Sequence, residues 1–420
     1  MKAKLTTLVV SCIFLLILVS CARQKHVWLT ELQQTHVANN NNVVRVYQDK
    51  NGYFYPDAAI YIPYAAFFDP LNNGTTTKNS LNAGSLEHYF TGYSLSTKGG
   101  YFEEDAERFT NRTKELANHY NVPVTASKKA VFDSVQNFII QQLGNSLTAL
   151  LEQTPSKTLV VLIHGFNDAN PTGDYLRLRT EIEEQTEKKY VFLEVYWDGL
   201  TANNGTPPFE KIWAAAQTNS QEAAVGLRLV LNSLPKDIKI RIITHSLGAS
   251  VGTATLFNTL SKWKHPKAFQ RYYDATLKIP APQQNDIRIG MMAPAIPGVS
   301  TFADFDNRLW PVNEENNNIN KVVVGFNTND YAVTKRLGKS QFLNGRFGAT
   351  NLGSNYNDEF KKTKKRLIES GFSTGYVDNL FIANDFTKYL DEKVEEPHGL
   401  YYYMQLEEPF KRFVNEMFEE

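Results

Sequence analysis

From residue 157 onward, apolar strand-like runs alternate with helical patterns, and this alternation limits the possible folds more than any other feature. Strands are predicted at 158–163, 190–197, 239–243, 287–293 and 321–326, and helices at 172–188, 209–234 and 247–263. This order predicts an α/β fold, with a mostly parallel central sheet covered by helices on both faces. Functional sites in such sheets lie at the carboxyl ends of the strands.

The N-terminus has the pattern of an export signal. Lys2 and Lys4 precede an apolar stretch at 5–19, which is followed directly by Ser20 and Cys21. The segment Leu-Val-Ser-Cys resembles a bacterial lipoprotein signal, and the resemblance implies cleavage before Cys21 and lipidation of its sulfur. We therefore expect a signal peptide at 1–20 and a chain anchored to a membrane of the bacterial cell envelope; an uncleaved anchor helix is the alternative. Ala22, in place of the aspartate that resembles an inner-membrane retention signal, favours the outer membrane.

The composition excludes several other functions. Lysine plus arginine number 44 and aspartate plus glutamate number 44, so the balanced charge argues against electrostatically driven binding of nucleic acid. The two cysteines are Cys12 and Cys21, and the signal would contain the first. The mature chain therefore has no partner for a disulfide, and we expect neither a catalytic cysteine nor cysteine-ligated zinc.

The segment before residue 157 is less informative. Residues 21–42 are polar and end in four asparagines, which indicates a tether. Residues 43–156 include a possible strand at 59–63 and helical patterns at 103–120 and 131–151, the last with apolar residues every three or four positions. We expect this N-terminal extension to pack on the domain that follows.

A serine follows the predicted strand at 239–243 and opens the next predicted helix. The motif reads Thr244-His245-Ser246-Leu247-Gly248. A serine on a sharp strand-to-helix turn holds its hydroxyl clear of the sheet edge, which suits a nucleophile. Gly248 supplies the space that the turn needs, whereas Thr244 stands where the G-x-S-x-G pattern has glycine.

A second motif follows the predicted strand at 158–163. It reads His164-Gly165-Phe166-Asn167, at the carboxyl end of a strand upstream of the serine. Together, and in this order, the two motifs resemble the α/β-hydrolase superfamily of serine esterases and lipases, over about residues 157–418. The resemblance implies that the backbone N–H groups of Leu247 and Phe166 form the oxyanion hole, with Gly165 as the alternative to Phe166.

The resemblance also implies that an acid and then a histidine follow the serine, each after its own strand. Only His265 and His398 come after the serine, and His265 lies at the end of the predicted helix at 247–263, too early to follow an acid-bearing strand. His398 is therefore the expected base. Asp330, after the strand at 321–326, is the expected acid, and the alternatives are Asp378 and Asp385, beside a candidate strand at 377–383.

The hydrolase-like region, 157–420, contains three long connections, at 265–286, 297–320 and 334–375, which we interpret as possible lid insertions. A basic helix is predicted at 360–370. We expect a membrane-anchored serine hydrolase that acts on a small-molecule carboxylic ester through an acyl-enzyme, with no metal or organic cofactor. Acyl transfer by the same triad, peptide cleavage and a non-catalytic binding or structural lipoprotein remain as alternatives.

Overall fold

The computed structural model describes most of the chain from residue 36 onward. The described residues are 36–37, 42–63, 67, 84–95, 101–125, 127–166, 168, 171–199, 209–257, 279–303, 319–334, 336–337, 340–341, 352–387 and 398–419. The predicted signal peptide at 1–20, Cys21 and His265 lie outside these residues, as do large parts of the three predicted insertions.

An eight-stranded sheet lies at the centre of the structure, in the order β1-β2-β6-β5-β7-β8-β9-β12. Its strands are β1 (His36–Val37), β2 (Val43–Tyr47), β5 (Thr158–Ile163), β6 (Val191–Tyr196), β7 (Lys239–His245), β8 (Asp286–Met292), β9 (Ile319–Phe326) and β12 (Phe381–Asp385). Neighbouring strands from β2 to β12 pair in parallel, and the two-residue β1 pairs antiparallel with β2. The predicted α/β class with a mostly parallel sheet is confirmed.

The central strands β5, β6 and β7 are buried along almost their whole length. Their sequences consist mainly of apolar and β-branched residues, as parallel strands covered on both faces require. The buried charges among them are paired. Glu194 lies 2.8 Å from Arg45 and 2.9 Å from Arg179, and Arg241 lies 2.7 Å from Asp286. These pairs offset the cost of removing the charges from water.

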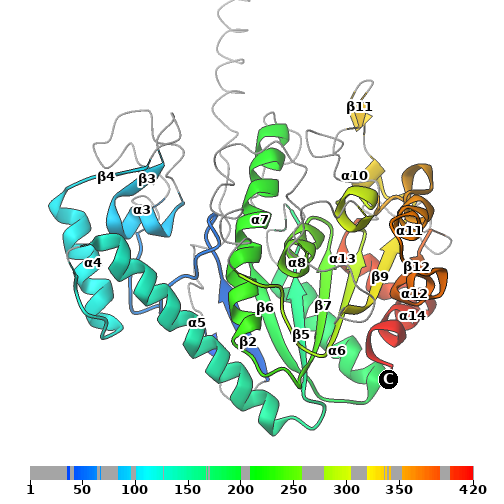
Figure 1. Cartoon of the computed structure of the whole chain (residues 1–420), viewed down its shortest axis with the longest axis horizontal. Coiled ribbons are helices and arrows are strands. Elements are labelled where there is room, and N and C mark those ends of the chain that lie inside the picture. Colours follow the sequence, from blue (N-terminus) through cyan, green and yellow to red (C-terminus); the bar gives the residue numbers. More distant parts are fainter. Residues whose placement is uncertain are drawn as a thin grey trace, which may run out of the picture.

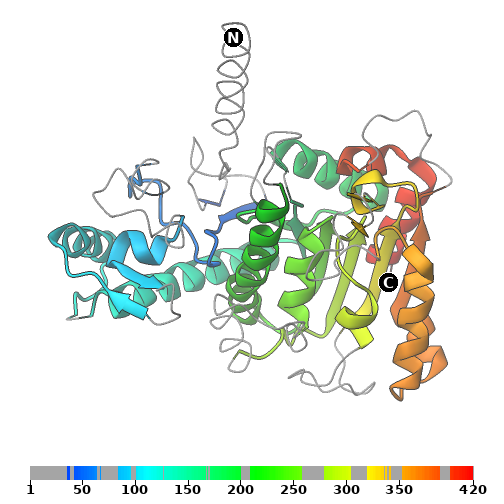
Figure 2. The ribbon, with the colours of Figure 1, turned by 90° about the horizontal axis from the view of Figure 1, so that it is seen from above.

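Helices cover both faces of the sheet (Figures 1 and 2). On one face lie α5 (Lys128–Gln153), α7 (Phe209–Asn232) and α8 (Gly248–Leu256), and on the other lie α6 (Pro171–Thr186), α13 (Leu400–Gln405) and α14 (Glu407–Phe418). Of the apolar stripe that the sequence predicts on helix α5, Phe132, Val135, Ile139, Leu143 and Leu147 are buried, whereas Leu150 is half-buried and its neighbour Leu151 is buried instead. Helix α5 therefore buries the face that its helical periodicity predicts.

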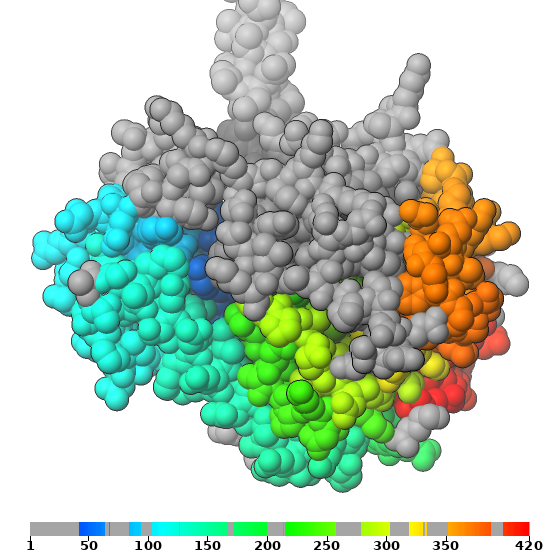
Figure 3. All heavy atoms as spheres, viewed as in Figure 1, coloured from blue at the N-terminus to red at the C-terminus, as the bar shows by residue number. Residues whose placement is uncertain are grey.

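The N-terminal extension both joins the sheet and forms a layer beside it. Strand β2 pairs with β6, and His36 and Val37, within the predicted tether, form β1. Helices α3 (Leu86–Thr91) and α4 (Glu107–His119) pack with α5, next to the hairpin of β3 (Tyr93–Leu95) and β4 (Tyr101–Glu103). In Figure 3 this part forms one flank of the molecule, in blue and cyan.

The opposite flank lies beside β12. Helices α11 (Glu359–Glu369) and α12 (Thr374–Leu380) follow the short elements α10 (Tyr331–Thr334), β10 (Arg336–Leu337), β11 (Ser340–Gln341) and η6 (Tyr356–Asp358). Helix α11 contacts η4 (Val299–Ala303), and its Phe360 ring stacks on Phe381 with centroids 4.9 Å apart. The helical part of the predicted 334–375 insertion therefore packs on the edge strand of the sheet.

Three sequence predictions were wrong in detail. Residues 59–63 form no strand, because Asp57 Oδ1 accepts a hydrogen bond from the Ala59 amide and closes a turn there. The candidate strand at 377–383 begins only at 381, since the Ser373 hydroxyl caps helix α12 by accepting from the Tyr376 amide. The helical pattern at 103–120 starts late, and its first residue ends strand β4.

Candidate active site

Ser246 lies on the turn between β7 and α8, at the carboxyl edge of the sheet. Its φ angle is +50°, in the left-handed region that residues other than glycine seldom adopt. Backbone hydrogen bonds hold this conformation. The Ser246 amide donates to Met292 O at 3.0 Å, and the Ala295 amide donates to Ser246 O at 3.0 Å. The neighbouring strand β8 and the residues after it therefore fix the strained turn that the sequence predicts.

Two predicted glycines occupy positions with no room for a side chain. A Cβ on Gly248 would lie 2.4 Å from the carbonyl oxygen of His164, and a Cβ on Gly165 would lie 2.9 Å from the Cβ of Ser246. The His164-Gly165 turn and the serine turn therefore touch each other, although about 80 residues separate them in the sequence. This contact brings the two predicted motifs into one site.

The three predicted triad residues meet at this edge. The Ser246 hydroxyl donates to His398 Nε2 at 2.9 Å, and His398 Nδ1 donates to Asp330 Oδ2 at 2.7 Å. These distances are those of good hydrogen bonds. The serine is 5% exposed and the aspartate is fully buried, while the histidine is half-buried between them. The structure therefore joins the predicted nucleophile, base and acid, from three distant segments, by hydrogen bonds.

Asp330 follows β9, and its surroundings favour the ionised form of its carboxyl group. Burial raises the pKa of its carboxyl group, but the positive charge and hydrogen bond of His398 and the hydrogen bonds from Tyr403 and the Ala332 amide outweigh burial, so the net pKa is lowered. The Ala332 amide donates to Oδ1 at 2.9 Å and the Val333 amide donates at 3.4 Å. An ionised carboxylate in this position fixes the tautomer of His398 that donates from Nδ1.

Two further side chains hold the triad. His245, predicted only as part of the serine turn, donates from Nε2 to the backbone carbonyl of His398 at 2.7 Å. Burial first, and then the neighbouring charge of His398, lower the pKa of His245 to about 3, so it stays neutral and keeps this donor. Tyr403 donates to Asp330 Oδ2 at 2.8 Å. Sequence reasoning missed Tyr403, and the only signal for it was its place five residues after the predicted base.

The predicted oxyanion-hole residues belong to the two turns that meet at the serine. Leu247 is the N-cap of α8, and no described residue accepts a hydrogen bond from its amide. Phe166 lies after β5 and packs its ring edge-on against Trp213, with centroids 5.1 Å apart. The alternative donor, Gly165, lies directly against the serine. An amide at a helix start next to the nucleophile can stabilise an oxyanion.

His164 has a structural position beside these residues. Its Nδ1 donates to Gly165 O at 2.8 Å, and its ring stacks on Trp197 with centroids 5.5 Å apart. Burial lowers its pKa to about 4, so it is neutral near pH 7. These contacts hold the turn that faces Ser246.

The two alternative acids lie in other surroundings. Asp378, on α12, forms an ion pair with Lys364 of α11 and is half exposed. Asp385, at the end of β12, caps the following turn by accepting from the Thr387 amide at 2.8 Å. Neither contact involves the triad, so the geometry favours Asp330 as the partner of His398.

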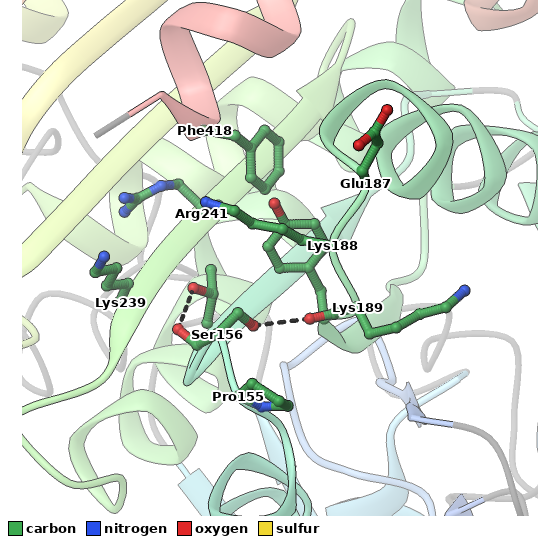
Figure 4. Close-up of a pocket in the computed structure, with 10 residues that line it drawn as sticks. Pro155, Ser156, Glu187, Lys188, Lys189, Lys239, Arg241 and Phe418 are labelled. Atoms are coloured by element: carbon green, nitrogen blue, oxygen red, sulfur yellow. Dashed lines mark hydrogen bonds between the residues drawn. The ribbon is translucent and has the colours of Figure 1, made fainter.

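A hollow at the opposite edge of the sheet is a different feature (Figure 4). It has a volume of about 490 Å³ and lies where β5, β6 and β7 begin, next to Tyr190, Lys239 and Phe418. The triad lies at the carboxyl ends of the strands and this hollow at the amino ends. It is therefore not the pocket in which a substrate of Ser246 would bind.

Within the described parts of the chain, no group of three or more histidine, cysteine, aspartate or glutamate side chains is arranged to hold a metal ion. In the same residues, no helix has the length and apolar character needed to cross a bilayer. Comparisons with protein-family models, with curated proteins and with solved structures found no match to this chain.

Proposed function

We propose that the chain is a serine hydrolase of the α/β-hydrolase type and that it cleaves carboxylic esters. In the first step, His398 Nε2 takes the proton of the Ser246 hydroxyl while Oγ attacks the ester carbonyl carbon. Asp330 holds the Nδ1–H of His398 and stabilises the positive charge that the ring acquires. The tetrahedral intermediate collapses when His398 gives this proton to the departing alcohol, which leaves an acyl group on Ser246.

The second half repeats these steps with water. His398 removes a proton from a water molecule, the hydroxide oxygen attacks the acyl carbon, and Ser246 recovers its proton as the carboxylic acid leaves. In both halves the oxyanion accepts hydrogen bonds from the amide of Leu247 and from the amide of Phe166, or of Gly165. These roles need only the groups of this chain and water.

One observation carries the proposal: the hydrogen-bonded chain from Ser246 through His398 to Asp330, with the serine on a strained turn. A structural serine would have little reason to adopt a φ of +50° within 2.9 Å of a histidine that a buried carboxylate orients. The parallel sheet, with the three residues at the carboxyl ends of its strands, also supports this function.

A panel of p-nitrophenyl esters of increasing acyl length tests the proposal. We expect hydrolysis by the wild type and a loss of roughly four orders of magnitude or more in kcat for Ser246→Ala and for Asp330→Asn. Asp378→Asn is the matched control and should keep wild-type activity. Adding alcohols and measuring ester products against free acid separates hydrolysis from acyl transfer. A folded wild type that cleaves none of these esters, or a fully active Ser246→Ala variant, would contradict the proposal.

We also propose that the chain is anchored to the bacterial envelope through a lipid on Cys21. The pattern Leu-Val-Ser-Cys after a short apolar segment supports this anchor. Expression in a bacterium with radiolabelled palmitate should label the wild type and not Cys21→Ser. Labelling that persists in Cys21→Ser would contradict it.

A further inference from the structure

Among the described contacts, the carboxylate of Asp330 accepts two hydrogen bonds on each oxygen. Oδ1 accepts from the backbone amides of Ala332 and Val333, at 2.9 and 3.4 Å. Oδ2 accepts from His398 Nδ1 at 2.7 Å and from the Tyr403 hydroxyl at 2.8 Å. The tyrosine therefore shares the oxygen that orients the base, and the two donors compete for its negative charge.

The structure holds Tyr403 firmly in this place. The side chain is fully buried on α13, and its ring packs edge-on against Phe386, with centroids 5.1 Å apart. Burial, and then the adjacent Asp330 carboxylate, raise the pKa of its hydroxyl well above 10, so it donates at any working pH. His398 and Tyr403 are five residues apart on the same short segment, and both donate to Oδ2 of Asp330.

We propose that Tyr403 is a positioning residue of the triad: its hydroxyl fixes Oδ2 of Asp330 and withdraws part of its charge, which sets how strongly this oxygen binds His398. The inference rests on the proposed hydrolase function for its effect on rate, but not for its effect on the Asp330–His398 hydrogen bond. Without the hydroxyl, the carboxylate would lose one of its hydrogen bonds and become a stronger acceptor for the imidazole.

The groups described around this carboxylate decide how a pH effect is interpreted. They are His398 and Tyr403 from the C-terminal segment and the amides of α10, with the neutral His245 next to His398. A more basic carboxylate stabilises the charged imidazole, so the acid limb of the kcat/KM profile should move to higher pH when the tyrosine hydroxyl is removed.

Tyr403→Phe keeps the buried ring and removes only the hydroxyl, and Tyr402→Phe, on the neighbouring half-buried tyrosine, is the matched control. On the best ester of the panel we expect kcat to fall about tenfold, the factor that one net hydrogen bond corresponds to, with KM unchanged. The acid limb should move upward in Tyr403→Phe alone. If both variants match the wild type in kcat and in pH profile, Tyr403 serves only packing and the inference is wrong.

A readout that needs no activity separates this inference from the hydrolase proposal. The proton between His398 Nδ1 and Asp330 Oδ2 should give a far-downfield ¹H NMR signal, absent in Asp330→Asn. We expect it to move further downfield in Tyr403→Phe and upfield when Tyr403 is replaced by the more acidic 3-fluorotyrosine. If Tyr403→Phe does not fold, the fluorotyrosine protein alone decides. A signal that is missing from the wild type, or that stays in place, would overturn the inference, whereas moving signals in an inactive protein would count against the hydrolase function alone.

Discussion

The side chain of Thr244 faces Gly252, one turn into helix α8. A Cβ on Gly252 would lie 2.9 Å from Thr244 Cγ2 and 3.1 Å from Ile289 Cδ1. The G-x-S-x-G pattern has its glycine at the end of the strand, whereas this chain has threonine there and a glycine on the facing helix. The strand and the helix therefore still approach each other closely, but the glycine that allows this lies on the helix, at Gly252, and not at the end of the strand.

This relationship can be measured by a double-mutant cycle. Gly252→Ala should destabilise the protein by about 1–2 kcal/mol, because overpacking outweighs the better helix propensity of alanine. Thr244→Ser removes only the clashing methyl group, so Gly252→Ala should cost less in that background. Gly173→Ala, at an exposed helical glycine with open space, is the control and should not destabilise. Equal costs for Gly252→Ala in both backgrounds would show that the two residues do not interact.

His245 should matter for rate without touching the substrate. His245→Ala leaves the carbonyl of His398 without its donor, so the base can shift from the serine, and a small displacement is costly in catalysis. We expect kcat on the best ester to fall tenfold to about a hundredfold, with partial recovery in His245→Gln, whose amide can still donate. Wild-type kcat in His245→Ala would show that this hydrogen bond does not position the base.

The strained backbone at Ser246 should lower the free energy of unfolding of the protein. With φ at +50°, a residue with a Cβ is less stable than glycine by about 1 kcal/mol. Both Ser246→Gly and Ser246→Ala should be inactive, but the glycine variant should unfold at a higher urea concentration. If Ser246→Ala were as stable as Ser246→Gly or more stable, the backbone at residue 246 would not be strained.

Two buried histidines, His164 and His245, and the half-buried His88 should make the protein sensitive to acid. Burial is the main cause that lowers the pKa of His88 and His164 to about 4 and that of His245 to about 3, from 6.5. The unfolded chain binds protons at these sites below pH 6.5 and the folded chain does not, so the stability that is complete above pH 6.5 is lost as the pH falls toward 4. Each histidine should contribute a slope of up to about 1.4 kcal/mol per pH unit.

Urea unfolding at pH 7, 6 and 5 checks this slope. His88→Gln, in the N-terminal flank, should reduce the slope by close to one proton and leave ester hydrolysis unchanged. An unfolding free energy that stays constant from pH 7 to pH 5 would contradict the neutral state of these histidines.

The sequence predicted the central strands well, and the reason is physical. Strand β5 was predicted with its observed ends, because a fully buried parallel strand is a continuous apolar run. Strand β2 was not predicted. It is only five residues long and has Arg45 at its centre, which is compatible with the sheet only because Glu194 on the next strand pairs with it.

In the candidate site, too, some residues could be predicted from the sequence and others could not. Ser246, Asp330 and His398 could be named because each follows a recognisable strand or occupies the order that the resemblance implies. Tyr403 and the donor role of His245 could not, since their importance depends on which oxygen each hydroxyl or ring nitrogen reaches after folding. Likewise the candidate strand at 377–383 was wrong because a local cap at Ser373 outweighed its β-branched and aromatic residues.

The most direct test of the central claim is mass spectrometry of the folded protein after treatment with a fluorophosphonate. We expect one phosphonyl group, located on Ser246, and almost no labelling of His398→Ala, because the serine depends on that imidazole for its reactivity. A folded wild type that remains unlabelled, or one that is labelled elsewhere than at Ser246, would contradict the claim that these three side chains form a nucleophilic site.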